Sequence, residues 1–332
     1  MVGGSTISNT SAAFRSALFT ATRALFNQNY DQGANELVWP QFCTLVESTT
    51  DTEQYPWLGE NPSIKEWLAE RQHEGLEGFD YSLKNKNWEA TLDIDMNDVE
   101  DEKWGMIKLR VSELGYSATY GQDQYVADIV NDAINGGHAY GYCFDGKPMF
   151  ATNHNWSQAS ASQSNLRSGS NTGKLDITYG EANIKAAITA FKKFRNSKGR
   201  LIGGRPNVLM VSSQDIWDVR RILNSTGMII ATGGTAGSLV TTDRGNLNPL
   251  YGSGLTVIEN QWLDDGHGVL MQTSGPLRPF IFQMRKRPYF TSQDNENTSA
   301  AAFERRVLSY GLAGRWAAGF GPWFKAIAFD GT

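Results

Sequence analysis

Two apolar repeats of different period follow one another between residues 76 and 136, and this succession limits the fold more than any other feature of the sequence. From Phe79 to Met96, apolar and polar residues alternate on both sides of the polar stretch Asn85-Lys86-Asn87. An alternation of period two is typical of strands with one buried face, so the polar interruption predicts a β-hairpin over 76–97. A two-stranded hairpin is only marginally stable alone. Its apolar face is therefore expected to pack either on its own domain or on an adjacent subunit.

The second repeat, over residues 97–136, has the period of an α-helix. An Asn-Asp pair suited to capping precedes acidic residues at 100–102, which are favourable at a helix N-terminus. Apolar residues then recur at intervals of three, four or seven, which predicts one long amphipathic helix: Trp104, Ile107, Val111, Leu114, Ala118, Tyr125 and Ile129. Gly115 and Gly121 indicate a bend within it, and a Gly-Gly pair ends it.

The remainder of the chain mixes helices and strands. Ser212 and Asp215 have the spacing of a capping box and predict the start of a helix. The other expected segments are a helix at 179–194, strands at 207–211, 255–259, 268–272, 280–282 and 323–329, a loop over 226–256, and an ambiguous stretch at 303–313. This order indicates the α+β class, with about two domains for 332 residues.

The composition restricts the functions open to the chain. No apolar run is long enough to span a bilayer, and the first residues lack the basic and apolar regions of a secretory signal. Synthesis in the cytoplasm is therefore expected, with no membrane partner. A formal net charge of -5 argues against tight DNA binding through a basic surface. The 10 tryptophans in a chain with 34 glycines favour contacts between subunits, because aromatic residues are enriched at interfaces.

No pattern typical of an active site or a metal site stands out. The four histidines, His73, His138, His154 and His267, lack the spacing of metal ligands, and no P-loop is present. Cys143, Asp145 and His154 are close in sequence and could form a thiol nucleophile site. A turn beside a buried cysteine and a surface histidine is the favoured interpretation. No catalytic residue, cofactor or metal is predicted.

Several short stretches, taken in order, resemble the major head subunit family of Mu-like phages. The stretches are Tyr55-Pro56-Trp57-Leu58-Gly59, Glu66-Trp67, Glu70-Arg71, Asn85, Trp88-Glu89-Ala90-Thr91, Asp98-Val99-Glu100-Asp101-Glu102, Asp145-Gly146-Lys147-Pro148-Met149-Phe150 and His154-Asn155. The resemblance extends from about residue 45 to the end of the chain. It implies the capsid fold that tailed phages share, and a structural role rather than catalysis.

The resemblance implies four named parts. Residues 1–50 would be an N-terminal arm, and residues 75–97 an extended hairpin loop that overlaps a neighbouring subunit. A peripheral domain would comprise 51–74, 98–172 and 276–332, with a spine helix at about 100–136 and the C-terminal strands completing it. Residues 173–275 would form an axial domain, whose tips meet at the centres of hexamers and pentamers.

Apolar residues of the extended loop and of the arm are the expected contacts between subunits. The loop contributes Phe79, Tyr81, Leu83, Trp88, Leu92 and Ile94, and the arm contributes Phe14, Leu18 and Leu25. Lys84 and Lys86 lie where some relatives cross-link their subunits covalently. No cross-link is predicted, because nothing in the sequence brings an Asn and a catalytic acid to these lysines.

The function that the resemblance implies is a major capsid protein. Hexamers and pentamers would form an icosahedral shell around double-stranded DNA, without sequence-specific DNA binding. A separate scaffolding protein and a portal are expected partners, a decoration protein is a further candidate, and the expected location is the virion after assembly in the host cytoplasm. Two alternatives remain open: a nanocompartment shell around a cargo enzyme, and a thiol or metal-dependent hydrolase that uses Cys143 or His154.

Overall fold

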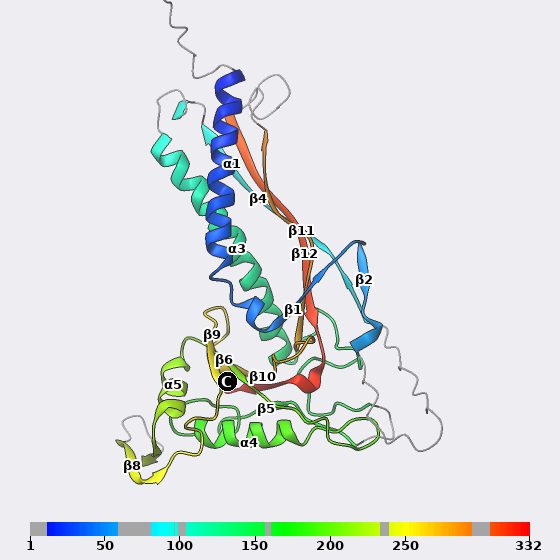
Figure 1. Ribbon diagram of the computed structural model, residues 1–332, viewed down its shortest axis with the longest axis vertical. Coiled ribbons are helices and arrows are strands. Elements are labelled where there is room, and N and C mark those ends of the chain that lie inside the picture. The colour runs from blue at the N-terminus through cyan, green and yellow to red at the C-terminus, as the bar shows by residue number, and fades with distance from the viewer. Residues whose placement is uncertain are drawn as a thin grey trace, which may run out of the picture.

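The computed structural model describes residues 12–58, 81–95, 97–98, 104–156, 161–232, 239–293 and 306–332. Within these ranges the chain forms two main sheets (Figure 1). A long four-stranded sheet runs beside two long helices, and a five-stranded sheet with shorter helices lies at its lower end in the view. Parallel and antiparallel strands are combined with helices, which confirms the expected α+β class.

The long sheet has the strand order β1-β11-β12-β4. Its strands are β1 (Cys43–Glu47), β11 (Phe280–Gln293), β12 (Val307–Phe320) and β4 (Lys86–Asp95). β1 runs parallel to β11, whereas β12 is antiparallel to both β11 and β4. Ile94 of β4 and Tyr310 of β12 belong to the apolar cluster that also contains side chains of the two long helices. The alternation in the sequence of β4 therefore reflects one covered face.

The two long helices, α1 (Ala12–Ala34) and α3 (Trp104–Ile134), lie side by side against this sheet. The long helix expected from the sequence is thus present as α3, and it runs unbroken through Gly115 and Gly121. Gly115 serves the contact with α1, because a Cβ atom added there would lie 3.0 Å from the carbonyl oxygen of Phe26.

Asp123 of α3 fixes the chain between α1 and β1. Its carboxylate accepts hydrogen bonds from the backbone N–H groups of Val38 and Trp39, each at 2.9 Å. Burial raises the pKa of the Asp123 carboxyl, and these two N–H groups oppose the shift. Trp39 begins the 3-10 helix η1 (Trp39–Gln41) and stacks on Phe282 with ring centroids 4.0 Å apart. Residues 37–47 are therefore anchored to the core of their own chain through the buried Leu37, Trp39, Phe42 and Cys43, which differs from the arm expected over 1–50.

The second sheet has the order β5-β13-β10-β6-β9. Its strands are β5 (Leu166–Ser168), β13 (Ala326–Asp330), β10 (His267–Met271), β6 (Val208–Val211) and β9 (Thr256–Glu259). Every residue of β6 and β10 is buried, so these strands lack an alternating pattern. The helices α4 (Gly180–Lys192) and α5 (Ile216–Asn224) pack on this unit through buried apolar residues such as Phe191 and Ile222.

The hairpin expected over 76–97 is wrong in its pairing. β3 (Ser82–Lys84) and β4 flank Asn85, yet β3 pairs with β2 (Thr52–Gln54), whereas β4 pairs with β12. The Asn85 side chain shows why the chain does not turn back on itself here. Its Nδ2 donates hydrogen bonds to the Ser48 hydroxyl and to the Thr50 carbonyl oxygen, both at 2.9 Å, and so binds this point to the segment between β1 and β2.

The C-terminal strand departs from the division expected from the sequence. Residues 276–332 are expected in a peripheral domain, but β13 lies between β5 and β10 in the second sheet. β5, from the range 98–172, joins the same sheet. The second unit is therefore built from two separate stretches of sequence, one from β5 to β10 and one that contains β13. Hydrogen bonds between strands that are distant in the chain decide this membership, and local patterns do not encode them.

A separate two-stranded ribbon lies at one end of this unit, beyond α5 (Figure 1). It consists of β7 (Gly227–Thr232) and β8 (Leu239–Leu247), paired antiparallel and separate from the other sheets. The sequence predicts a loop over 226–256, and this prediction is wrong for the two strands. The segments Met228-Ile229-Ile230 and Leu239-Val240-Thr241 are rich in residues that favour strands. The remaining short elements are the 3-10 helices η2 (Pro56–Leu58) and η3 (Trp323–Lys325).

Candidate functional site

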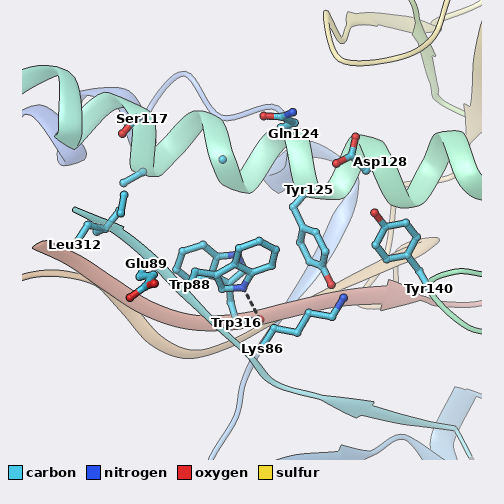
Figure 2. A pocket seen from close by; sticks show the side chains of 13 residues that line it. Lys86, Trp88, Glu89, Ser117, Gln124, Tyr125, Asp128, Tyr140, Leu312 and Trp316 are labelled. Atoms are coloured by element: carbon cyan, nitrogen blue, oxygen red, sulfur yellow. Dashed lines mark hydrogen bonds between the residues drawn. The ribbon is translucent and has the colours of Figure 1, made fainter. Parts of the chain in front are cut away.

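An aromatic cleft of about 470 Å³ lies between α3 and the edge strand β4 (Figure 2). Trp88 of β4 stacks on Trp316 of β12 with ring centroids 5.5 Å apart, and Tyr125 of α3 meets Trp88 edge-on at 4.7 Å. The Trp88 Nε1–H donates a hydrogen bond to the Trp316 carbonyl oxygen at 3.1 Å. These contacts fasten the edge strand to both the sheet and the helix.

Lys86 extends into the cleft toward two tyrosines (Figure 2). Its Nζ lies 5.1 Å from the ring centroid of Tyr125 and 5.2 Å from that of Tyr140, which is the geometry of cation–π contacts. Burial raises the pKa of Tyr125 to about 12, so its phenol stays neutral at physiological pH. Asp128 and Glu89 lie exposed at the rim. Rings gathered around a cation suit packing and recognition rather than acid–base chemistry.

Two of the residues expected to contact a neighbour are buried within their own chain. The Tyr81 hydroxyl accepts a hydrogen bond from the backbone N–H of Phe320 at 2.7 Å, and Ile94 lies in the cluster beneath the two long helices. The prediction of an intersubunit role is wrong for both, because their own chain already covers them. Three others are half-buried against the same core, namely Leu83, Trp88 and Leu92. Phe79 lies outside the described residues.

The residues expected in the arm lie on α1. Leu18 and Leu25 are half-buried and pack against the cluster between the helices and the long sheet. The side chain of Phe14 lies outside the described part of the chain. Sequence reasoning missed Phe26, which is fully buried and whose ring lies 5.4 Å from that of Phe290. Phe26 lies seven residues after Phe19, a spacing that places both on one face of a helix and could have identified it.

Asp145 and His154 come together as a buried pair that does not activate a cysteine. His154 Nδ1 lies 2.5 Å from Asp145 Oδ2, and the imidazole stacks on Trp323 at 4.5 Å. The expectation of a surface histidine is therefore wrong, because His154 is fully buried. The Cys143 thiol donates to the Gly321 carbonyl oxygen at 3.3 Å, and burial raises its pKa far above the usual range. A neutral, buried thiol is a poor nucleophile, so this cluster is poorly suited to thiol chemistry.

The described residues offer neither a metal site nor a membrane span. Among them, no group of three His, Cys, Asp or Glu side chains has an arrangement that could hold a metal ion. None of the helices described here is both long and apolar enough to cross a bilayer.

Exposed apolar side chains gather around α5 and the base of the β7–β8 ribbon. Trp217 is 71% exposed, Leu247 84% and Tyr251 56%. Single exposed apolar residues are ordinary, but a tryptophan with two companions at one end of a unit is typical of a contact surface. The sequence analysis did not select these residues. The position of Trp217 could have revealed this surface, because the periodicity of α5 places Trp217 on the side opposite the buried face.

Comparison with protein families places most of this chain within a known family. The model of the family described as Mu-like prophage major head subunit gpT matches residues 16–179 and 251–331, about three quarters of the chain. The matched ranges include strands of both main sheets.

Two curated proteins are similar in sequence. The Mu-like prophage FluMu major head subunit of Haemophilus influenzae is 30% identical over 131 residues, which are 39% of this chain and 41% of the relative. The major capsid protein of Escherichia phage Mu is 29% identical over 138 residues, 42% of this chain and 43% of the relative. The chain thus spans about two fifths of the length of the curated relatives it matches.

Solved structures with a similar fold come from viral and virus-like shells. The procapsid of bacteriophage JBD30 gives a TM-score of 0.53 at 20% identity and covers 96% of this chain and 75% of that chain. A virus-like particle from Pyrococcus furiosus gives 0.51 at 6% identity and covers 94% of this chain and 99% of the other. At such identities the likeness establishes the fold alone, and that fold is the tailed-phage capsid fold expected from the sequence.

Proposed function

Because the chain belongs to the Mu-like prophage major head subunit family, we propose that copies of it assemble into the shell of a bacteriophage head. The family match over about three quarters of the chain carries this proposal. The shell would be icosahedral, built from hexamers and pentamers, and would enclose double-stranded DNA without reading its sequence. Contacts between different patches of identical copies produce closed rings when the rotation between neighbours closes.

The two main sheets suit two roles in such a shell. α3, which runs along the four-stranded sheet, would be the spine of a peripheral part. The five-stranded sheet with α4, α5 and the β7–β8 ribbon would be the axial part, now including β5 and β13. The exposed residues Trp217, Leu247 and Tyr251 would then lie where the axial parts of neighbouring copies meet.

The segment that overlaps a neighbouring copy would be the ribbon formed by β2 and β3, and not a hairpin over 75–97. This ribbon has only three residues in each strand, and Thr52, Gln54, Ser82 and Lys84 are exposed. A ribbon of this size gains stability from a surface to lie on, and a neighbouring copy would supply one. The accessible parts of Leu18, Leu25, Leu83, Trp88 and Leu92 remain proposed contacts. A covalent cross-link through Lys84 or Lys86 is not proposed.

Other components of the head complete the proposed assembly. A scaffolding protein and a portal would act during assembly in the host cytoplasm, and the mature protein would reside in the virion. A decoration protein is a further candidate partner. The capsid of bacteriophage JBD30 decorated with minor capsid protein trimers, similar to this chain with a TM-score of 0.52 at 17% identity, motivates that choice.

Electron microscopy of negatively stained protein, expressed with and without candidate scaffold genes, tests the proposal. Closed shells, or rings of five and six copies, are the expected result. Trp217→Ser should reduce ring formation without changing the melting temperature of the subunit, because the side chain is 71% exposed. Leu109→Ser, at a residue 70% exposed on α3, is the matched control and should still form rings. Monomers or dimers of the unmodified protein under both conditions would overturn the proposal.

The two alternative functions gain less support. A nanocompartment shell would share the fold, but the family match points to phage head subunits. A hydrolase would need a reactive Cys143 or an accessible His154, and both side chains are buried.

A further inference from the structure

Charges are segregated by sign along parts of this chain. Residues 182–214 contain seven Lys and Arg residues and no acidic residue, whereas 111–146 and 245–277 contain acidic residues and neither Lys nor Arg. Long stretches of one sign create a surface potential that can attract a partner of opposite charge and orient it.

The basic stretch forms an exposed surface beside one edge of the second sheet. This basic surface comprises Lys192, Lys193, Arg195, Lys198 and Arg200, all exposed at the end of α4 and in the loop that follows. The Arg195 carbonyl oxygen accepts hydrogen bonds from Trp156 Nε1 (2.7 Å) and Gln163 Nε2 (2.9 Å), and the Arg195 N–H donates to Gln163 Oε1 (2.7 Å). Gln163 lies just before the edge strand β5, so these bonds hold the basic surface on that side of the sheet.

The acidic stretches meet at one end of the same sheet, where β9 finishes and β10 begins. This acidic surface comprises Asp128, Asp132, Glu259, Asp264 and Asp265, all exposed except the half-buried Asp132. Glu259 ends the edge strand β9, and the turn that contains Asp264 follows it. The Asp264 backbone N–H donates to Asn131 Oδ1 at 3.1 Å, which brings this turn to α3. Burial and the charge of Asp264 both raise the pKa of Asp128, so a cation from outside would stabilise its carboxylate.

Resting on the shell assembly proposed above, we propose that neighbouring copies in a ring are joined by the basic surface of one copy and the acidic surface of the next. The partner is therefore a second copy of this chain. Opposite charges at separate places on one unit give every copy the same head-to-tail contact, which is the arrangement that closes rings. Like surfaces repel, so the same charges disfavour a symmetric pairing of two copies.

An exposed apolar residue accompanies each of the two surfaces. Leu201, next to Arg200, is 58% exposed, and Trp217 lies on α5, which packs beside β9. An apolar anchor within a charged rim is the usual anatomy of a protein interface, where the charges set orientation and association rate while the buried apolar area holds the complex.

Charge reversal and exchange test the contact directly. Replacing Lys192, Lys193, Lys198 and Arg200 by Glu reverses the basic surface, and replacing Asp128, Glu259, Asp264 and Asp265 by Lys reverses the acidic one. Each fourfold variant alone should form no rings or shells and should keep a melting temperature close to that of the unmodified subunit, because all eight side chains are exposed. The variant that combines both sets should assemble again. An equal mixture of the two fourfold variants should form only rings with an even number of copies, since the two types have to alternate.

Controls separate this contact from effects of net charge and from failure of the shell proposal. Lys108→Glu with Arg110→Glu makes half of this charge change at exposed positions of α3 and should leave assembly intact. Raising NaCl from about 50 mM to about 500 mM should slow assembly of the unmodified protein roughly tenfold or more. If the unmodified protein forms shells and the two fourfold variants do so equally well, or if the combined variant fails to recover, the contact is wrong while the shell proposal stands. If the unmodified protein does not assemble, the shell proposal itself fails.

Discussion

Trp88 shows how a side chain that is partly accessible can still belong to the fold of its own subunit. Its ring lies against Trp316 and Tyr125, and its indole N–H bonds to the backbone of β12. We expect Trp88→Ala to lower the free energy of unfolding by about 3 kcal/mol, because the cleft cannot collapse around the lost ring. Urea denaturation of the isolated subunit measures this. Thr91→Ala, at an exposed residue of the same strand, should change stability by less than about 0.5 kcal/mol.

The outcome for Trp88 also decides whether the apolar face of β4 is covered by its own chain or by a neighbouring copy. A Trp88→Ala subunit with unchanged stability that nevertheless fails to assemble would place the ring between copies, as the sequence alone suggested. A destabilised subunit would place it in the core of its own chain, as its contacts indicate.

Glu53 gives the chain a specific dependence of stability on acid. Its carboxylate accepts hydrogen bonds from the backbone N–H groups of Thr50 (3.0 Å) and Thr49 (2.8 Å) and from the Ser48 hydroxyl (3.0 Å), which lower its pKa from 4.5 to about 2. A pKa lower in the folded state means that the carboxylate stabilises the fold above pH 4.5, and that this contribution disappears as the pH falls toward 2. Glu53→Gln should therefore lose less stability than the unmodified protein between pH 6 and pH 3.

Urea midpoints at these two pH values measure the effect of Glu53. The exposed Glu47→Gln in β1 is the control and should follow the unmodified protein. An equal loss of stability in the Glu53→Gln variant and the unmodified protein would mean that these hydrogen bonds do not lower the pKa of Glu53 in the folded state.

At the scale of elements, the contact of α1 with α3 gives two glycines of α3 different tolerance to a larger side chain. A Cβ atom at Gly115 would lie 3.0 Å from the carbonyl oxygen of Phe26, whereas a Cβ atom at Gly121 would meet nothing within 4 Å. We expect Gly115→Ala to destabilise the subunit by about 1–3 kcal/mol through overpacking. Gly121→Ala should stabilise it by roughly 0.5–1 kcal/mol, because alanine favours the helix. Thermal melts of both variants measure the difference, and shifts of the same sign would argue against a close packing of α1 on α3.

The whole molecule depends on its last strand. β13 lies between β5 and β10, so the second sheet cannot form around β10 and β6 without the C-terminal residues. Removal of 326–332 should abolish the slow hydrogen exchange of β6 and β10, or leave the protein insoluble, whereas removal of Thr332 alone should have little effect. Protection of β6 and β10 that survives the longer deletion would show that the second unit folds without β13.

Periodicity in the sequence determined α3, α4, α5 and strands such as β4, β6, β9 and β10, because the spacing of apolar residues along one segment depends only on whether one face of that segment is covered. Short stretches such as Tyr55-Pro56-Trp57-Leu58-Gly59 also carried the family resemblance that the family match bears out. The sequence likewise contained the single-sign stretches, although not their places in the fold.

Only the tertiary structure decided which strands pair and what covers each apolar face. β3 and β4 adjoin in sequence but bond to different strands, and β13 crosses to the sheet of β6 and β10. An alternating pattern indicates a buried face without specifying what buries it, so Tyr81 and Ile94 could not be assigned from the sequence to their own core or to a neighbour's surface. The contacts that made those assignments join residues far apart in the chain. Long-range contacts also place the basic surface and the acidic surface at separate sites on the unit of the second sheet.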